Sequence, residues 1–506
     1  MSDRSSSGSS NGPDTRPLED GNSENKTESR DHKVLKSGLW YTVASISIRA
    51  VAIITTPIYT SMLSTADYGT ANTFNSWIDL INIVTCLCVV YSIGRAKLDF
   101  PEKFDEYMSA LQGLSSSFAF IVLILATLFR EQLSRAMGYE VPLIIVLFTY
   151  LCISPSVEYM LQKCRYEYKY RENILISILT CVGTVFFSIT LMLLFQDRRY
   201  IGKILGTILP TFLMGIVFYI RLLAKGKRFF VKEYWSFALK IGLPMIPHAL
   251  ALSVLSQVDR LMVKDICGAA DSGLYVYGYG FATLLSIFTN AIGQAWLPWF
   301  NDELNSGNRD RIRGIQKKMV LLGCFLTIGF ITVAPEALMI LAPRARDYWV
   351  AKYVVAPVAL GTLAQYFYTN YVNVELFYKK TPIIAVSSCI AAVLNYGLNA
   401  FFIPRFGYIA AAYTTLTSYV ILMLLHYGAV TLLLKEKVYD SRFMFLAMII
   451  CSILGLSMVA LYGDPAGIRV LRYAAAVVVL GIFAFVNRGD IMILVSKVTD
   501  RLRSLK

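Results

Sequence analysis

The chain consists largely of long apolar runs separated by short polar segments. A helix that crosses a bilayer needs about 20 mostly apolar residues, and fourteen segments of this chain meet that requirement. The predicted spans are residues 39–61, 75–95, 108–129, 141–162, 173–195, 200–223, 236–263, 273–298, 319–342, 353–376, 382–403, 408–434, 443–462 and 468–487. The pattern predicts an all-α polytopic membrane protein with about fourteen transmembrane helices.

The distribution of basic residues among the loops provides a test of this count. Lys and Arg favour the cytoplasmic loops of membrane proteins. With the amino terminus in the cytoplasm, the predicted inner loops hold twenty Lys and Arg residues and the outer loops hold nine. The alternation continues along the chain, so we expect an even number of spans and two cytoplasmic termini.

Two short sequence matches indicate an internal repeat. Residues 66–69 precede span 2 and resemble residues 270–273, which precede span 8 at an offset of 204 residues. Tyr200-Ile201 and Tyr408-Ile409 open spans 6 and 12 at an offset of 208. These matches predict two homologous six-helix lobes plus two C-terminal helices, a parallel repeat known among transporters. Coincidence among apolar helices is the alternative.

The repeat divides the chain into five parts. These are a disordered cytoplasmic tail (1–32), an N-lobe (33–223), a basic cytoplasmic linker (224–235), a C-lobe (236–434), and a final part with spans 13 and 14 and a basic cytoplasmic tail (435–506). The first part is predicted to be disordered because it is polar and has no apolar pattern.

Composition narrows the class of function. Hydrophobic residues make up 56% of the chain and charged residues only 16%, too few charges to cover a soluble protein of this size. The net charge of +14 is concentrated in the inner loops, so we expect no nucleic acid partner. The sequence has no metal-ligand spacing, nucleotide-binding motif or catalytic motif. We therefore expect a transporter rather than an enzyme, with no metal and no cofactor.

Spans 2 and 8 each carry a polar stripe at helical spacing. The stripe of span 2 contains Asn75, Asp79, Asn82 and Cys86, and the stripe of span 8 contains Tyr279, Thr283, Ser286, Asn290 and Gln294. A polar stripe within lipid must face protein or water. We expect the two stripes to face each other across a substrate cavity, with Asp79 as an ion-coupling or gating group. Hydrogen bonding between neighbouring helices is the alternative.

Three cations within the predicted spans are candidates for binding an anionic substrate. Arg49 lies about ten residues into span 1, so it lines a cavity or pairs with Asp79. Lys240 and His248 flank Pro244 and Pro247 in span 7, where two prolines are expected to bend or break the helix. Lys240 alternatively reaches the interface, and His248 alternatively binds a carbonyl that the prolines release.

The remaining candidates concern ion coupling or gating. Asp259 and Arg260 follow one another in span 7 and form either a gate or a solvated ion pair at the membrane surface. Glu336 in span 9 is a further intramembrane carboxylate that could bind a coupling cation. Glu158 and Glu375 lie near the inner ends of their spans, where basic loops are expected to pair with them.

Four blocks of sequence resemble a known family. They are Gly-Leu-Pro-Met-Ile-Pro-His at 242–248, Ser-Gln-Val-Asp-Arg at 256–260, Ala-Ala-Asp-Ser-Gly-Leu-Tyr at 269–275, and Asn-Ala-Ile-Gly-Gln at 290–294 with Pro298-Trp299. This region resembles polysaccharide biosynthesis proteins of the Wzx type, which are flippases of the multidrug/oligosaccharidyl-lipid/polysaccharide exporter superfamily. The similarity of pattern extends over most of the chain after residue 33.

The resemblance implies a function and a set of partners. The substrate would be an undecaprenyl-diphosphate-linked oligosaccharide repeat unit, moved from the inner to the outer leaflet of a bacterial cytoplasmic membrane for an O-antigen or capsule. Alternating access would be driven by H⁺ or Na⁺, and the protein would contact membrane lipids and the polymerase and glycosyltransferases of its pathway. The alternatives are a cation-coupled drug or metabolite exporter of the same superfamily, a membrane-embedded glycosyl- or phosphotransferase, and a scaffold for polymer synthesis.

Overall fold

The computed structural model describes residues 51, 53–167, 169–463 and 466–486, which form helices joined by turns and contain no strand. The first half contains α2 (Thr65–Thr85), η1 (Val89–Ser92), α3 (Ile93–Asp99), α4 (Phe104–Leu128), α5 (Arg130–Met137), α6 (Val141–Ile153), α7 (Pro155–Tyr166), α8 (Tyr170–Leu194), η2 (Gln196–Arg198) and α9 (Arg199–Gly226). The second half contains α10 (Lys232–Ser253), η3 (Val254–Val258), α11 (Asp259–Cys267), α12 (Ala269–Ala282), α13 (Leu285–Asn305), α14 (Arg309–Leu341), η4 (Arg346–Ala351), α15 (Lys352–Phe377), α16 (Thr381–Phe406), α17 (Tyr408–Gly428), η5 (Ala429–Leu433), α18 (Ser441–Ala460) and α19 (Ala466–Val486).

The all-α multi-pass architecture predicted from the sequence is confirmed, whereas the count of fourteen spans is not. Within the described residues, ten helices are long and apolar enough to cross a membrane, or up to eleven if α2 and the 55° bent segment Val89–Asp99 form one span. Most of the predicted span 39–61 lies outside the described residues. The predicted span 273–298 is divided into α12 and α13 by a turn at Thr283 and Leu284.

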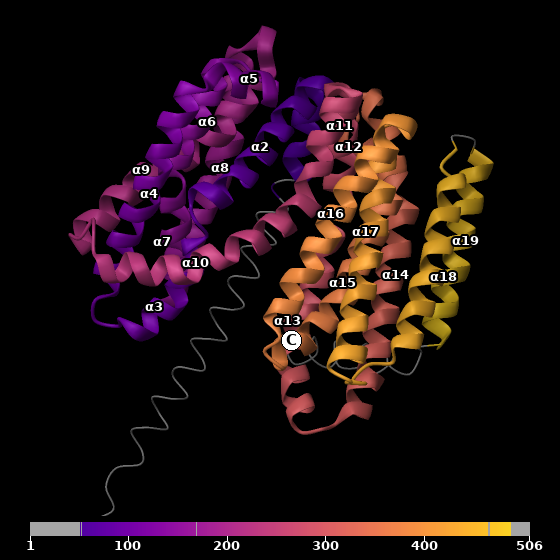
Figure 1. The fold of residues 1–506 in the computed structure, drawn as a ribbon. Helices are drawn as coiled ribbons and strands as arrows, with labels where there is room; N and C mark the ends of the chain where they lie inside the picture. Colours follow the sequence, from indigo (N-terminus) through magenta and orange to yellow (C-terminus); the bar gives the residue numbers. More distant parts are fainter. Residues whose placement is uncertain (1–50, 52, 168, 464–465, 487–506) are drawn as a thin grey trace, which may run out of the picture.

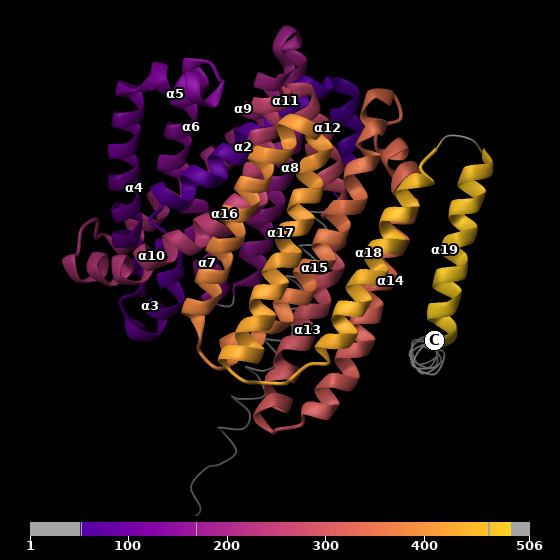
Figure 2. The ribbon, with the colours of Figure 1, turned by 45° about the vertical axis from the view of Figure 1, so that its right-hand side comes forward.

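The helices form two bundles that meet at one end (Figure 1). In the first bundle, α9 packs against α4 and α8, and in the second α17 packs against α15 and α16. The turned view shows α18 and α19 at the outside of the second bundle, beside α14 (Figure 2). α10 runs between the bundles, and five residues separate it from the end of α9.

The bundles meet where α2 crosses α12 through a pair of glycines. A Cβ atom on Gly69 would lie 2.2 Å from the carbonyl oxygen of Ala269, and one on Gly273 would lie 1.9 Å from that of Thr65. Only glycine permits this approach of the two backbones. Thr65 and Ala269 are related by the same offset as the two glycines. The contact is therefore reciprocal, as expected for two repeats related by a two-fold axis.

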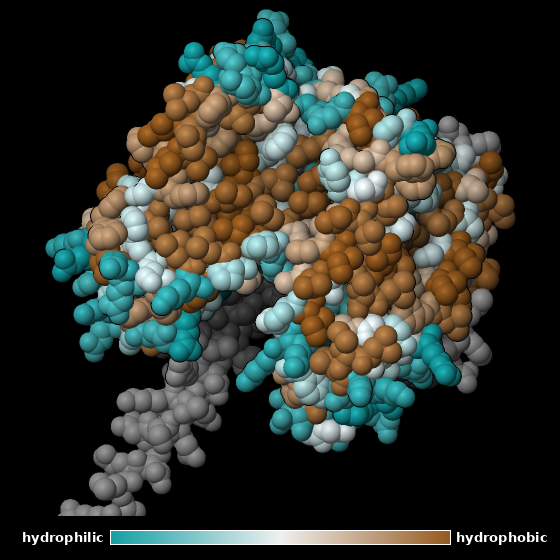
Figure 3. Space-filling model, viewed as in Figure 1, coloured by the Kyte–Doolittle hydropathy of each residue, from teal (hydrophilic) through white to brown (hydrophobic). Residues whose placement is uncertain are grey.

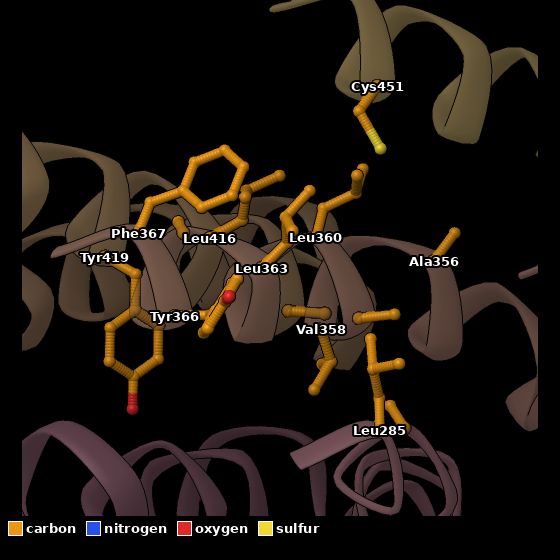
Figure 4. Close-up of a cluster of buried hydrophobic side chains, with 14 of the residues drawn as sticks. Leu285, Ala356, Val358, Leu360, Leu363, Tyr366, Phe367, Leu416, Tyr419 and Cys451 are labelled. Atoms are coloured by element: carbon orange, nitrogen blue, oxygen red, sulfur yellow. The ribbon is translucent and has the colours of Figure 1, made fainter. Parts of the chain in front are cut away.

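The surface and the core have the polarity of a membrane protein. A broad hydrophobic band covers both bundles between hydrophilic ends (Figure 3). In the second bundle, 83% of the most apolar stretch of Arg346–Phe377 is buried. In the first bundle, the corresponding share for Tyr170–Leu194 is 11%. Phe367, Leu363 and Leu416 pack between α15 and α17 (Figure 4). α15 is thus the central helix of this bundle, whereas α8 presents most of its surface outward.

Candidate functional site

A polar cavity of about 520 Å³ lies on the second bundle. Its walls come from η3, α11, α12, α13, α15, α17 and the turn at 283–284. The lining residues are Ser256, Gln257, Arg260, Tyr279, Thr283, Ser286, Thr289, Asn290, Gly293, Trp296, Leu297, Val358, Thr362, Gln365, Tyr366, Thr369, Asn370, Asn373, Thr415 and Tyr419. Most of these residues carry a hydroxyl or amide group, a composition suited to a ligand with many hydroxyl groups.

Arg260 supplies the charge of this cavity. Of the described residues that line the cavity, it is the only one with a charged side chain. Its guanidinium lies over the ring of Tyr279, 4.6 Å from the ring centroid, and its Nε is buried without a hydrogen-bond partner. Guanidinium presents a planar set of donors that suits phosphate oxygens. The cavity therefore combines one positive charge with many neutral hydrogen-bonding groups.

The cavity wall continues into α2 through Gln257. The side-chain amide of Gln257 donates to Oδ2 of Asp79 over 3.0 Å, and its oxygen accepts from the Ser76 hydroxyl over 3.0 Å. Gln257 belongs to η3, a turn of π-helix between α10 and α11. Such turns re-aim side chains and often occur at functional sites. Asp79 therefore lies next to the cavity wall.

The structure places the irregular backbone of span 7 at η3 rather than at the prolines. α10 stays helical through Pro244 and Pro247, and the π-helical turn begins seven residues after Pro247. A proline removes one backbone donor and disturbs only the preceding turn. The position of η3 instead follows its packing, since it contacts both α2 and α16.

A polar stripe along α15 is a feature that sequence reasoning missed. It consists of Thr362, Gln365, Tyr366, Thr369, Asn370 and Asn373. Spacings of three and four residues place these side chains on one face of the helix. The same spacing is visible in the sequence and could have revealed the stripe.

A second polar group lies behind the cavity, around Asp259. The Asp259 carboxylate accepts hydrogen bonds from Tyr275 and, over 3.4 Å, from the Thr415 hydroxyl. The neighbouring positions of α16 and α17 carry Asn395, Asn399, Thr414 and Ser418, which hydrogen-bond to one another. All seven of these side chains are buried. One carboxylate that accepts hydrogen bonds from two hydroxyl groups thus lies beside a network of four neutral oxygen-bearing side chains.

The structure brings only some of the candidate residues together. Arg260, Tyr279 and Asn290 line the cavity, and Asp259 and Asp79 adjoin it. Asn75 and Asn82 are partly buried on α2, and Asn82 accepts from the thiol of Cys86 over 2.9 Å. The described part of the first bundle contributes no residue to the cavity lining. Arg49 and the side chain of Gln294 lie outside the described residues.

The other candidates lie elsewhere. Lys240 is exposed in a separate apolar groove beside Trp235 and Pro244. His248 is partly buried on α10, and its Nδ1 has no hydrogen-bond partner. Glu336 forms an ion pair with Arg472, whose side chain is 1% exposed. This ion pair joins α14 to α19.

The sequence and the fold define the family of this protein. The family model described as "Polysaccharide biosynthesis protein" matches residues 34–302, more than half of the chain. The chain therefore belongs to the polysaccharide biosynthesis protein family.

Two proteins of Haemophilus influenzae strain Rd are similar to this chain in sequence. A protein of the Lsg locus is 23% identical over 378 residues, which cover 72% of this chain and 89% of the relative. An uncharacterized membrane protein is 19% identical over 381 residues, with the same two coverages.

Solved structures with the same fold are membrane transporters. The lipid II flippase MurJ in an inward closed conformation superimposes with a TM-score of 0.67 at 14% identity, covering 90% of this chain and 99% of that one. An inward-facing multidrug resistance transporter of the MATE family, in the MOP superfamily, gives a TM-score of 0.59 at 12% identity, covering 82% and 98%. This chain is thus a multi-pass membrane protein with the fold of that superfamily.

Proposed function

We propose that this protein is a flippase that moves an undecaprenyl-diphosphate-linked oligosaccharide repeat unit from the inner to the outer leaflet by alternating access. The observation that carries the proposal is Arg260, which places one positive charge in a cavity otherwise lined by neutral groups. Membership of the polysaccharide biosynthesis family supports the glycan part of the substrate. The fold shared with a lipid II flippase supports the lipid part.

The cavity offers separate groups for the two polar parts of such a substrate. The Arg260 guanidinium would bind a diphosphate oxygen, because it is the charged donor in the cavity lining. The amides of Gln365, Asn370 and Asn373 on α15 would hydrogen-bond the sugar hydroxyls. The isoprenoid tail would remain in lipid beside the bundles.

A cation would drive the movement through the group around Asp259. The Asp259 carboxylate and the hydroxyls of Tyr275 and Thr415 meet at this position, and a network of four further buried oxygen-bearing side chains lies on the neighbouring helices α16 and α17. Carboxylate, amide and hydroxyl oxygens are the ligands of hard cations, which favours Na⁺ over H⁺. Thr415 belongs both to this group and to the cavity lining, so cation binding would be transmitted directly to the substrate site.

Alternating access would use the crossing of α2 and α12 as its outer closure. With the basic loops in the cytoplasm, this crossing lies toward the outer side. Tyr348 reinforces it, since its hydroxyl donates to the carbonyl oxygens of Leu63 and Ser64 over 3.1 and 3.0 Å. Opening toward the outer side would separate the paired glycines.

Binding of the substrate by single-site variants tests the role of Arg260. Full-length protein in nanodiscs should bind a fluorescent undecaprenyl-diphosphate oligosaccharide. Arg260→Ala should weaken this binding by about tenfold or more, because a charge-assisted hydrogen bond is worth about 1.5–3 kcal/mol. Arg346→Ala is a matched control, because Arg346 also lies over an aromatic ring but outside the cavity. Equal affinity of Arg260→Ala and wild type would remove the main support for the proposal.

A drug exporter of the same superfamily is the second candidate, favoured by the MATE transporter that shares the fold. The charge of the cavity argues against an organic cation as its substrate, because Arg260 would repel it. A wild-type protein that binds a cationic dye more tightly than the undecaprenyl-diphosphate oligosaccharide would favour this alternative.

A further inference from the structure

A buried acid–base pair joins two helices of the second bundle away from the cavity and from Asp259. Nδ1 of His426 in α17 lies 2.9 and 3.0 Å from the two carboxylate oxygens of Glu375 in α15. The side chains are 1% and 0% exposed. Nε2 of His426 is buried and has no hydrogen-bond partner. The pair lies near the ends of both helices, beside the loops that carry Lys379, Lys380 and Lys435.

The charged and titratable groups around the pair leave it without another partner. The neighbouring elements bring Tyr368, Tyr371, Tyr378, Lys379 and Lys380 from α15 and the turn after it; Tyr427, Lys435, Glu436, Tyr439 and Asp440 from the segment after α17; and Arg309 and Lys317 from α14. Arg309 pairs with Glu436, and Lys317 pairs with Asp440. Tyr378 donates to Glu436. Of these groups, Tyr368 contacts the imidazole through its ring.

The pair needs one exchangeable proton to be electrically neutral. An ionised Glu375 beside a neutral His426 would leave a net negative charge in an apolar interior, which is strongly unfavourable. One added proton gives either a carboxylic acid beside a neutral imidazole or a carboxylate beside an imidazolium. Both forms have no net charge. The proton leaves when a conformational change, which also occurs without substrate, lets water reach the pair and solvate the remaining charge.

A stack of aromatic rings connects this pair to the cavity. The imidazole of His426 stacks on Tyr368 with ring centroids 5.5 Å apart and an interplanar angle of 16°. Tyr368 stacks on Tyr419 at 6.3 Å and 9°. Tyr419 lines the cavity, and in Figure 4 its ring extends away from the packed side chains between α15 and α17. A ligand that displaces Tyr419 would therefore displace the ring that covers His426.

We propose that Glu375 and His426 form a proton-exchange site, and that its occupancy is linked to that of the cavity through the rings of Tyr368 and Tyr419. The proposal goes beyond the proposed flippase by adding a site separate from the cation group at Asp259. One proton from water binds to the pair and one returns to water, so no other bond forms or breaks. Transport of the cavity ligand is then accompanied by proton movement.

Proton movement in liposomes tests this proposal. The full-length protein is reconstituted in sodium-free buffer with an imposed pH gradient, and an internal pH-sensitive dye is followed after adding undecaprenyl-diphosphate oligosaccharide. The wild type should dissipate the gradient. Glu375→Gln keeps the shape and an acceptor for His426, and it should reduce this proton movement at least tenfold while gradient-free movement of the lipid persists. His426→Gln should behave in the same way.

Matched variants separate this effect from a structural one. Glu172→Gln removes an exposed carboxylate that is 3.8 Å from Arg221, and it should move protons at the wild-type rate. Tyr368→Leu leaves the pair intact but breaks the ring stack, so it should uncouple proton movement from the added lipid. Wild-type proton movement in Glu375→Gln would overturn the proposal.

A measurement without substrate keeps the proposal independent of the flippase function. Purified protein in nanodiscs is titrated from about pH 5 to pH 9, a range that covers the ordinary histidine transition, and bound protons are counted with a pH electrode. The wild type should bind one proton more than Glu375→Gln over this range. Identical titration curves would overturn the proton-exchange site, even if lipid movement were observed. A failure of lipid movement alone would overturn only the proposed flippase function.

Discussion

At the scale of single residues, the contrast between Arg260 and Asp259 organises the site. The two are adjacent in sequence, yet Arg260 lines the cavity whereas Asp259 points into the buried group behind it. Successive residues of a helix point about 100° apart, so one short segment can serve two sites. The substrate charge and the driving cation would thus be handled by neighbouring side chains on one rigid element.

Replacement of Asp259 tests the assignment of the cation group. Asp259→Asn removes the one carboxylate of the group, so stimulation of transport by a sodium gradient should fall at least tenfold while gradient-free transport persists. The measurement is the initial rate of lipid movement in liposomes with and without the gradient. Asp265→Asn on the same helix is the control, since Asp265 is exposed. A normal sodium response in Asp259→Asn would contradict the assignment.

The sequence indicated those residues of the candidate site whose type is unusual in a membrane span. Asp259, Arg260 and Tyr279 stood out because charged or polar groups are costly in lipid. The amides of α15 were missed, because asparagine and glutamine are ordinary between packed helices. The partners of Glu336 and Glu375 could not be found either, since Arg472 and His426 are distant in sequence and meet them only in the folded bundle.

At the scale of helices, close packing at particular points decides which elements can move. The crossing of α2 and α12 tolerates no side chain at Gly69 or Gly273. The ion pair between Glu336 and Arg472 holds α19 against α14. Helical periodicity predicted most of these elements, but the turn at η3 could not be predicted, because it depends on contacts with α2 and α16.

A larger residue at Gly69 should prevent the bundles from closing at the crossing. In Gly69→Leu the Cβ alone would lie 2.2 Å from the Ala269 oxygen, well inside the contact distance of about 3.5 Å, so the helices must separate by about 1–2 Å or more. Spin labels at Ser64→Cys and Asp271→Cys in a cysteine-free background should report a longer distance. Gly280→Leu on α12 is the control, since its Cβ would meet no atom within 4 Å.

Loss of Arg472 should loosen the last helix. Arg472→Leu removes the cation that pairs with Glu336, so we expect the free energy of unfolding to fall by about 1–3 kcal/mol, less than for a fully buried ion pair because the Glu336 side chain is 29% exposed. Thermal unfolding in detergent would measure this as a lower melting temperature. The double variant with Glu336→Gln should recover much of the loss, because it also removes the unpaired charge. Equal melting temperatures of all variants would show that the ion pair contributes little.

At the scale of the whole molecule, the two bundles and their crossing suit a transporter that alternates between two open sides. The all-helical architecture followed from the apolar runs. The repeat predicted that the stripes of spans 2 and 8 face each other across a cavity, whereas α2 packs directly against α12 and the described residues of the first bundle contribute nothing to the cavity lining. The number of fourteen spans stays unconfirmed, since most of the predicted span 39–61 lies outside the described residues and α12 and α13 divide another predicted span at Thr283 and Leu284. A turn inside an apolar run leaves composition unchanged, so a count based on apolar length cannot detect it.

Movement of the lipid-linked glycan between leaflets tests the central claim most directly. Fluorescent undecaprenyl-diphosphate oligosaccharide is placed in both leaflets of liposomes, and a membrane-impermeant quencher is added outside. Liposomes without protein should lose about half of the fluorescence, because only the outer leaflet is accessible. Liposomes with the wild type should lose nearly all of it within minutes, and those with Arg260→Ala should resemble the empty ones. A wild-type protein that leaves the inner-leaflet half protected, while it is folded and binds the lipid, would contradict the account.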